Sequence, residues 1–126
     1  MIRKATEKDF SLVAKLAYFM WSNHTCEDLE NKFADTLAKR NAVSFLMYEK
    51  ERPLGFAQCE LRHDDVEGSA SSTSGYLEGI FVKETYRNHG DAKALLKECE
   101  TWAALQGYKE FTNYYYLTTL FITCRI

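Results

Sequence analysis

The chain has 126 residues, 46% of them hydrophobic and 14% aromatic, and its formal net charge at pH 7 is −2. This length and composition predict one folded domain over residues 1–126 and argue against a disordered chain. Lys and Arg are scattered along the sequence, so it offers neither a basic stripe for nucleic acid nor a polybasic anchor for a membrane. The mildly acidic balance favours a cationic partner.

The sequence also lacks the features of an exported or a metal-binding protein. No apolar run approaches the ~20 residues of a membrane span, and residues 1–7 lack the apolar core of a signal peptide, so we expect a cytoplasmic protein. The cysteines and histidines are too dispersed for a zinc site or a disulfide framework, which predicts reduced thiols and no bound metal. These residues are Cys26, Cys59, Cys99, Cys124, His24, His63 and His89.

The N-terminal part predicts a strand and two helices. Residues 2–5 are typical of a short strand, and Thr6 with Asp9 three positions later is typical of a capping box. Apolar residues at helical spacing, Phe19 among the last of them, extend the first helix to about Trp21. A second helix is predicted over residues 27–39, with Asn41 as its C-cap.

A hairpin and a polar segment follow. Residues 43–49 and 54–62 predict its two strands, and residues 50–53 predict the turn between them. Residues 63–75 are polar and rich in Ser and Gly, which predicts a loop. Such a loop is either a connector or a substrate-binding lip, because loops carry function on rigid scaffolds.

A Gly-containing turn then joins a strand, residues 76–82, to an amphipathic helix that Gly107 ends, and residues 108–116 predict a fifth strand. A turn that opens a helix gathers backbone N–H groups at the positive end of the helix dipole, which favours a pyrophosphate. The alternative is an ordinary surface turn before a helix that packs on the core. The turn reads Arg87-Asn88-His89-Gly90-Asp91-Ala92-Lys93.

This turn resembles the acetyl-CoA loop of the GCN5-related N-acetyltransferases (GNAT), whose pattern is Gln/Arg-x-x-Gly-x-Gly/Ala. The predicted order of strand, two helices, hairpin, strand, helix and strand is similar to the order of that fold. The resemblance implies an α/β fold of the α+β type, with a mixed, mostly antiparallel sheet flanked by helices.

The resemblance narrows to one branch, the aminoglycoside 6'-N-acetyltransferases, and covers residues 1 to about 111. Members of that branch carry an Arg-His-Asp-Tyr-Val-x-Gly segment, a Ser-rich loop, a Leu-Glu-Gly-Ile-Phe-Val strand and the acetyl-CoA turn. The corresponding segments here are Arg62-His63-Asp64-Asp65-Val66-Glu67-Gly68, the Ser-rich residues 69–75, Leu77-Glu78-Gly79-Ile80-Phe81-Val82 and the turn quoted above.

The resemblance implies where acetyl-CoA binds. In such enzymes the fourth strand opens away from the fifth, and the pantetheine arm pairs with the exposed edge. Gly79 fits the bulge that bends this strand, and a backbone N–H near its end could hold the oxyanion of the thioester. The implied cofactor residues are Ile80, Phe81 and Val82 on the strand and Asn88, His89, Gly90, Asp91, Ala92 and Lys93 around the pyrophosphate.

The resemblance also implies the residues that handle the substrate. Glu78 is the candidate catalytic residue, because an alkylammonium with a reference pKa near ~10 must lose a proton before it attacks, and a carboxylate can take that proton through water. Trp21 matches the Trp that lines the antibiotic site, and Asp65 is the third predicted substrate residue. Without the resemblance, Glu78 would be an outward strand position and Trp21 a core residue at a helix end.

Three departures from the family bear on activity. Asp65 replaces a Tyr, and Asp91 replaces a small aliphatic residue, where a carboxylate repels phosphate but suits a helix N-terminus. After Phe111 the resemblance stops, and Tyr114 stands where the family has an Asp that contacts the aminoglycoside. The tail, residues 112–126, is divergent, so we expect an incomplete C-terminal part that either exposes a sheet edge or supplies one replacement strand.

The sequence therefore predicts a transferase that moves acetyl from acetyl-CoA to the 6'-amine of an aminoglycoside antibiotic and so confers resistance. A homodimer is the assembly that the resemblance implies. Two alternatives remain: a GNAT enzyme that acts on another amine, such as a polyamine or a protein N-terminus, and a truncated, non-catalytic remnant that binds CoA weakly.

Overall fold

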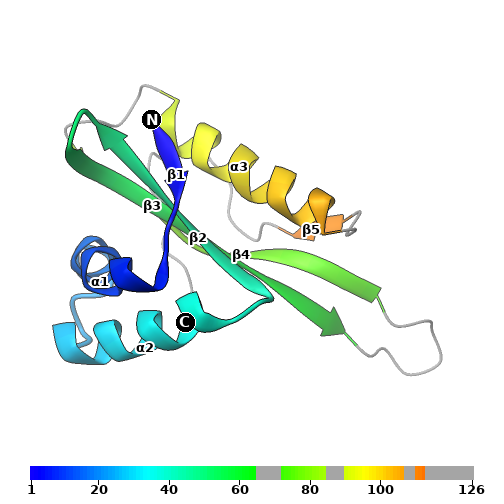
Figure 1. The fold of residues 1–126 in the computed structure, drawn as a ribbon, viewed down its shortest axis with the longest axis horizontal. Helices are drawn as coiled ribbons and strands as arrows, with labels where there is room; N and C mark the ends of the chain where they lie inside the picture. The colour runs from blue at the N-terminus through cyan, green and yellow to red at the C-terminus, as the bar shows by residue number, and fades with distance from the viewer. Residues whose placement is uncertain (65–71, 85–89, 107–109, 113–126) are drawn as a thin grey trace.

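A five-stranded sheet with helices on both faces forms the fold (Figure 1). The structure is a computed structural model that describes residues 1–64, 72–84, 90–106 and 110–112. Strands β1 to β4 pair antiparallel in sequence order and β5 joins β4 in parallel, which confirms the predicted mixed, mostly antiparallel sheet. The elements are β1 (Ile2–Lys4), the 3₁₀ helix η1 (Glu7–Asp9), α1 (Phe10–Tyr18), α2 (Cys26–Ala38), β2 (Ala42–Glu49), β3 (Arg52–Asp64), β4 (Ser72–Val82), α3 (Asp91–Leu105) and β5 (Glu110–Thr112).

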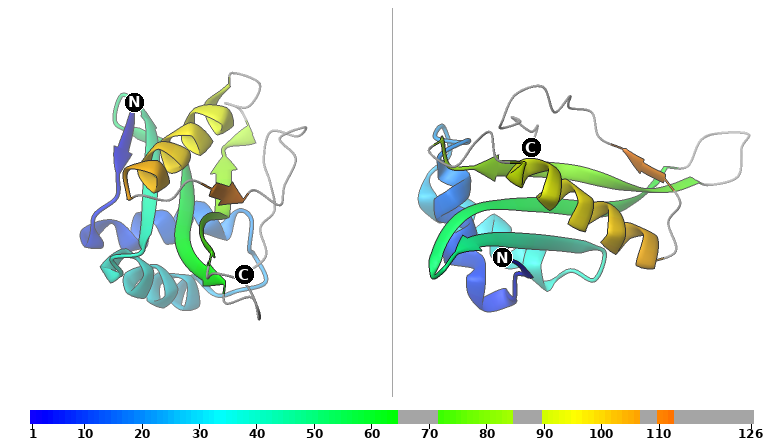
Figure 2. Two further views of the ribbon diagram at one scale, coloured as in Figure 1. Left: turned by 90° about the vertical axis from the view of Figure 1, so that its right-hand side faces the viewer. Right: turned by 90° about the horizontal axis from the view of Figure 1, so that it is seen from above.

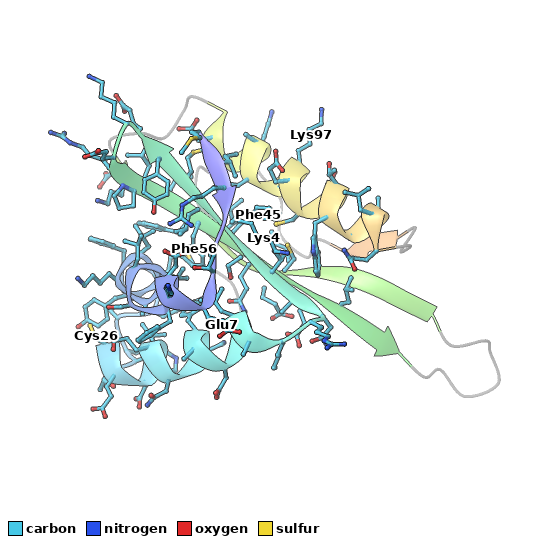
Figure 3. The ribbon with its side chains drawn as sticks, viewed as in Figure 1. Lys4, Glu7, Cys26, Phe45, Phe56 and Lys97 are labelled. Atoms are coloured by element: carbon cyan, nitrogen blue, oxygen red, sulfur yellow. The ribbon has the colours of Figure 1, made fainter. Side chains whose placement is uncertain are left out.

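Two hydrophobic clusters hold the helices on opposite faces of this sheet (Figure 2). Alternate side chains of a strand point to opposite faces, so Phe45 of β2 joins the cluster under α3 while Leu46 joins the cluster under α1 and α2. Phe56 of β3 is fully buried on the α1 and α2 side (Figure 3). Each residue of the central strands can therefore be assigned to one of two environments.

The predicted caps are half right. The Asp9 carboxylate accepts hydrogen bonds from the backbone N–H of Thr6 at 2.7 Å and from its hydroxyl at 3.1 Å, although the cap starts the 3₁₀ helix η1 and not α1 itself. Asn41 was predicted as the C-cap of α2, but Lys39 holds that position with an extended backbone. Asn41 instead binds β3. Its backbone carbonyl accepts a hydrogen bond from the backbone N–H of Leu61 at 2.7 Å, and its side-chain amide donates one to the backbone carbonyl of Leu61 at 3.3 Å.

Helix α1 is shorter than predicted. It ends at Tyr18, and the backbone N–H of Trp21 bonds back to the carbonyl of Ala17 at 2.9 Å in a tight turn. This turn carries Trp21 under α2, where its ring stacks on Phe33. The chain therefore leaves the helix after Tyr18 and buries the indole of Trp21. The spacing of apolar residues could not predict this end of the helix.

The hairpin of β3 and β4 is longer than predicted. Residues 63–64 and 72–75, predicted as loop, are paired strand, and the hairpin projects beyond the helices (Figure 1). The prediction was wrong because it relied on polar side chains, whereas strands pair through their backbones. Residues 65–71, and Asp65 with them, lie outside the described residues.

The C-terminal elements follow the predicted order. Helix α3 begins directly after Gly90 and buries Leu95, Cys99 and Trp102, as the helical spacing predicts. Strand β5, residues 110–112, falls within the predicted fifth strand, and the remainder of that strand and of the divergent tail lies outside the described residues. Among the described residues, no helix is both long and apolar enough to cross a membrane.

Candidate active site

Strand β4 carries a bulge at Glu78. Gln58 of β3 pairs with Gly79, but the next residue of β3, Cys59, pairs with Leu77, so Glu78 is the additional residue. A bulge of this kind sets two residues of one strand against one of its partner. The sequence had assigned the bulge to Gly79, which is the adjacent position and the other residue opposite Gln58.

The bulge determines which way Glu78 points. Leu77 and Ile80 both join the cluster under α3, although residues an odd number of positions apart on a regular strand face opposite ways. Glu78 and Gly79, between them, therefore both lie on the other face, the one covered by α1 and α2. Phe81 follows on that face, within the cluster under α1 and α2. Glu78 is half-buried there.

The predicted cofactor strand thus has two faces. Ile80 and Val82 are buried toward α3, and Phe81 is buried toward α1. Phe19, just after α1, stacks on Phe81 with ring centroids 5.5 Å apart and planes 4° apart. Phe19 is 67% exposed, whereas its helical spacing had predicted a buried residue, and no feature of the sequence connected it with Phe81. One exposed aromatic ring therefore packs on the strand that carries Glu78.

Trp21 is a buried residue in this structure, only 6% exposed. Its ring stacks on Phe33 at 6.4 Å and meets Phe56 edge-on at 6.3 Å. The ammonium nitrogen of Lys32 lies 5.6 Å from the centroid of the Trp21 ring, within the range of a cation–π contact. This packing agrees with the core interpretation, and contact between Trp21 and a substrate stays a prediction.

The start of α3 has the geometry of an anion site. Gly90 is the N-cap with φ of 79° and ψ of 8°, a left-handed conformation that glycine adopts without the usual strain. The first helical N–H groups follow, with Asp91 and Ala92 partly buried and Lys93 exposed, and such groups have no intrahelical partner. This end of α3 fits a pyrophosphate apart from the Asp91 carboxylate. The predicted contacts of Asn88 and His89 lie outside the described residues.

Two of the described cysteines, Cys59 and Cys99, belong to the core, whereas Cys26 is exposed. Cys26, Cys59 and Cys99 are free thiols, and the last two are fully buried under α3. Burial raises the pKa of the Cys59 thiol well above its usual value, and its hydrogen bond with Cys99 and the charge of Glu78 act in the same direction. A protonated, buried thiol is a poor nucleophile, which agrees with the predicted packing role.

A cavity of about 300 Å³ lies at the other end of α3 and contains none of the predicted site residues. Three of its side chains are cationic, so it is unsuited to an amine substrate. Its lining residues are Lys4, Ala5, Leu37, Lys39, Arg40, Ala42, Val43, Ser44, Trp102 and Gln106. Within the described part of the chain, no group of three or more His, Cys, Asp and Glu side chains is placed to hold a metal ion.

Comparison with known proteins gives the family. Residues 8–116 match the acetyltransferase (GNAT) family. The chain belongs to this family. The chain is 32% identical to an aminoglycoside N(6')-acetyltransferase type 1 from Stenotrophomonas maltophilia. The alignment extends over 113 residues and covers 89% of this chain and 72% of that protein.

Solved structures confirm the GNAT fold. The aminoglycoside N-acetyltransferase AAC(6')-Iy in complex with CoA matches with a TM-score of 0.83 and 27% identity, over 93% of this chain and 77% of that one. AAC(6')-Iy in complex with the bisubstrate analogue CoA-S-monomethyl-acetylneamine matches with a TM-score of 0.82 and 27% identity, over 94% of this chain and 81% of that one. The acyl donor of this GNAT chain is acetyl-CoA, as predicted.

Proposed function

We propose that this GNAT chain transfers the acetyl group of acetyl-CoA to the 6'-amine of an aminoglycoside antibiotic and so inactivates the drug. One observation carries the proposal: the bulge in β4 directs Glu78 to the face covered by α1 and α2, beside the strand segment predicted to bind the cofactor. The relatives named above, which are aminoglycoside acetyltransferases, supply the substrate class.

Glu78 performs two tasks in this proposal. Its negative charge attracts the protonated amine, and its carboxylate then takes a proton from the ammonium, since only the neutral amine can attack the thioester carbonyl. The C–N bond forms as the C–S bond breaks, and the sulfur leaves as the thiolate of CoA. A half-buried carboxylate suits this work because it keeps access to water while its charge is less screened than at the surface.

The cofactor contacts divide between two elements. The backbone of Ile80, Phe81 and Val82 would hold the pantetheine arm, and one N–H of this segment would stabilise the oxyanion. The start of α3 would hold the pyrophosphate, with the left-handed Gly90 bringing the first helical N–H groups toward it. β4 and α3 pack on each other through the cluster that contains Ile80 and Leu95, so the two halves of the site are rigidly linked.

The proposal also covers assembly and location. We place the enzyme in the cytoplasm, the compartment that its co-substrate and its sequence favour, and we expect a homodimer. Light scattering of the purified protein at several concentrations measures the assembly. A mass equal to one chain at all concentrations would contradict the dimer and leave the catalytic proposal standing.

The test of the catalytic proposal is acetyl-CoA-dependent thiol release with kanamycin or tobramycin as acceptor. Glu78→Gln should lower kcat at pH 7 by about a hundredfold, a typical contribution of a general base. The matched control is Glu60→Gln on β3, another half-buried strand glutamate, whose carboxylate lies 3.7 Å from the ammonium of Lys39. That variant should keep the activity.

Two results would oppose this assignment. Thiol release that is equal in Glu78→Gln and in the unchanged protein would remove Glu78 from the reaction. Release with spermidine but with neither antibiotic would assign a polyamine as the acceptor. Both assays require only a folded protein, which circular dichroism verifies for each variant.

A further inference from the structure

A row of polar positions crosses the sheet at the bulge. Ser44 of β2 pairs with Gln58 of β3, and Gln58 pairs with Gly79 of β4. Two residues further along, Leu46, Phe56 and Phe81 form the parallel row, and all three belong to the cluster under α1 and α2. Strand alternation puts the side chains of Ser44 and Gln58 on that same face.

Each of the two side chains in this row has a buried oxygen that lacks a hydrogen-bond partner among the described residues. Ser44 is 0% exposed and Gln58 is 2% exposed. Within the part of the chain that the structure describes, Ser44 Oγ and Gln58 Oε1 have no hydrogen-bond partner. Buried polar atoms in native proteins are normally paired with protein or with water, so each such atom requires an explanation.

The position of Gln58 beside Glu78 explains its unpartnered oxygen. Glu78 and Gly79 together oppose Gln58 across the hairpin, and all three lie on the same face of the sheet. Gly79 has no side chain to separate the Gln58 amide from the Glu78 carboxylate. A buried side-chain acceptor that needs a donor therefore lies on the same face, and at the same place in the hairpin register, as the carboxylate proposed to receive the substrate proton.

We propose that Gln58 is a positioning residue for acetyl transfer, and that its amide oxygen holds the water molecule through which Glu78 deprotonates the acceptor amine. This inference rests on the function proposed above. The water accepts a hydrogen bond from the substrate ammonium, donates one hydrogen to Glu78 and donates the other to Gln58 Oε1. Buried waters typically make about three such bonds, and this arrangement gives the unpartnered oxygen its donor.

The proton balance closes without another reactant. The ammonium gives one proton to the water, and the water gives one proton to the Glu78 carboxylate, which becomes a carboxylic acid. The neutral amine then attacks the thioester carbonyl. Gln58 changes neither its charge nor its covalent bonds, because its part is to fix the water along the line from nitrogen to carboxylate.

The test replaces Gln58 with Met, which has a similar length and no hydrogen-bonding oxygen. Gln58→Met should lower kcat about tenfold at pH 7, since one of the water's three hydrogen bonds is lost. The KM for the aminoglycoside should stay within about twofold, because the charge of Glu78 still attracts the cation. The melting temperature should not fall, because Met fills a similar volume and leaves no buried oxygen that needs a donor.

The pH profile separates this role from a structural one. At pH 9.5 a far larger fraction of an amine with a reference pKa near ~10 is already neutral, so the kcat defect of Gln58→Met should shrink to less than about threefold. A packing defect would reduce kcat by the same factor at both pH values. The matched control is Ser44→Ala, which removes an equally buried, unpartnered oxygen from β2, one strand further from Glu78. It should keep kcat at both pH values.

The outcomes distinguish the two proposals. A large defect in Glu78→Gln with full activity in Gln58→Met would overturn the role of Gln58 and keep that of Glu78. Equal defects at pH 7 and pH 9.5, or the same loss in Ser44→Ala, would also overturn it. Full activity in Glu78→Gln would remove the proposed base, and the relay through Gln58 with it.

Discussion

Among single residues, Asp9 has a carboxyl pKa well below its usual value. Arg3 donates two hydrogen bonds to its carboxylate, Nη1 to Oδ2 and Nη2 to Oδ1, both at 2.9 Å. These bonds, followed by those from the N–H and hydroxyl of Thr6, outweigh the opposing effect of burial and lower the pKa of Asp9 to about 2. Since the folded pKa is below the unfolded one of ~3.9, the stabilisation is present above pH 4 and is lost as the pH falls toward 2.

Asp9→Asn should therefore lower the free energy of unfolding by about 1 kcal/mol at neutral pH, a value reduced for the partial exposure of the pair. Urea denaturation at pH 7, 5, 4 and 3 measures the difference between the two proteins, which should decrease below pH 4. Glu51→Gln, in the exposed turn between β2 and β3, is the control and should change stability by less than about 0.5 kcal/mol. A difference that stays constant down to pH 3 would contradict the linkage.

The sequence predicts contacts between residues that are close in the chain better than it predicts contacts between different strands and helices. The bond of Asp9 to Thr6 follows from their spacing, and the helical pattern around Cys99 follows from its period. The unpartnered oxygen of Gln58 could not be predicted, because it depends on which residues of β2 and β4 lie beside it. Trp21 shows the same limit: its match to a family position could not reveal that Lys32 covers its ring.

At the scale of elements, the order and the type were predictable while the ends were not. Apolar periods and turn residues identify each helix and strand, and the family resemblance orders them. The limits depend on tertiary pairing: α1 stops where Trp21 turns inward, and β3 continues to Asp64 because β4 offers a backbone partner. The bulge at Glu78 follows from the register of the hairpin, which the sequence leaves open by one position.

Gly55 tests the fit between β3 and β4 beside the cofactor segment. It pairs with Met47 on one side and Val82 on the other. A Cβ at this position would collide with the carbonyl oxygen of Phe81 and lie 3.1 Å from the Cα of Val82. Gly55→Ala should displace residues 81–82, lower the free energy of unfolding by about 1–3 kcal/mol and raise the KM for acetyl-CoA.

Gly90→Ala is the contrasting variant. Among the described residues, no atom lies within 4 Å of a Cβ at Gly90, so we expect the substitution to cost the strain of a left-handed residue, about 1 kcal/mol. Urea denaturation of both variants, with the KM for acetyl-CoA measured in each, makes the comparison. If the Gly55→Ala protein is as stable as the unchanged protein, then β4 can move away from the added Cβ without a loss of free energy of unfolding, which would contradict the prediction.

For the whole molecule, ligand binding and stability are coupled through α3. The cluster under α3 joins this helix to β2, β3 and β4. A ligand that spans the end of β4 and the start of α3 therefore binds the folded chain and not the unfolded one. Acetyl-CoA at ~100 times its dissociation constant should stabilise the protein by about 2.7 kcal/mol.

Asp91 should reduce this coupling. Its carboxylate at the first position of α3 favours the helix dipole and repels a pyrophosphate at the same N–H groups. Asp91→Asn should unfold more easily than the unchanged protein without ligand, by about 0.3–1 kcal/mol, yet gain more stability from a fixed concentration of acetyl-CoA. Thermal unfolding with increasing acetyl-CoA should give two curves of melting temperature that cross.

Asp28→Asn is the matched control, because Asp28 lies in the first turn of α2, away from the cofactor segments of β4 and α3. That variant should lose a similar amount of stability without ligand and then gain only as much from acetyl-CoA as the unchanged protein. Equal gains in Asp91→Asn and Asp28→Asn would mean that the pyrophosphate does not bind at the start of α3. A larger gain in Asp91→Asn alone would mean that this residue weakens the cofactor site in exchange for a more stable helix.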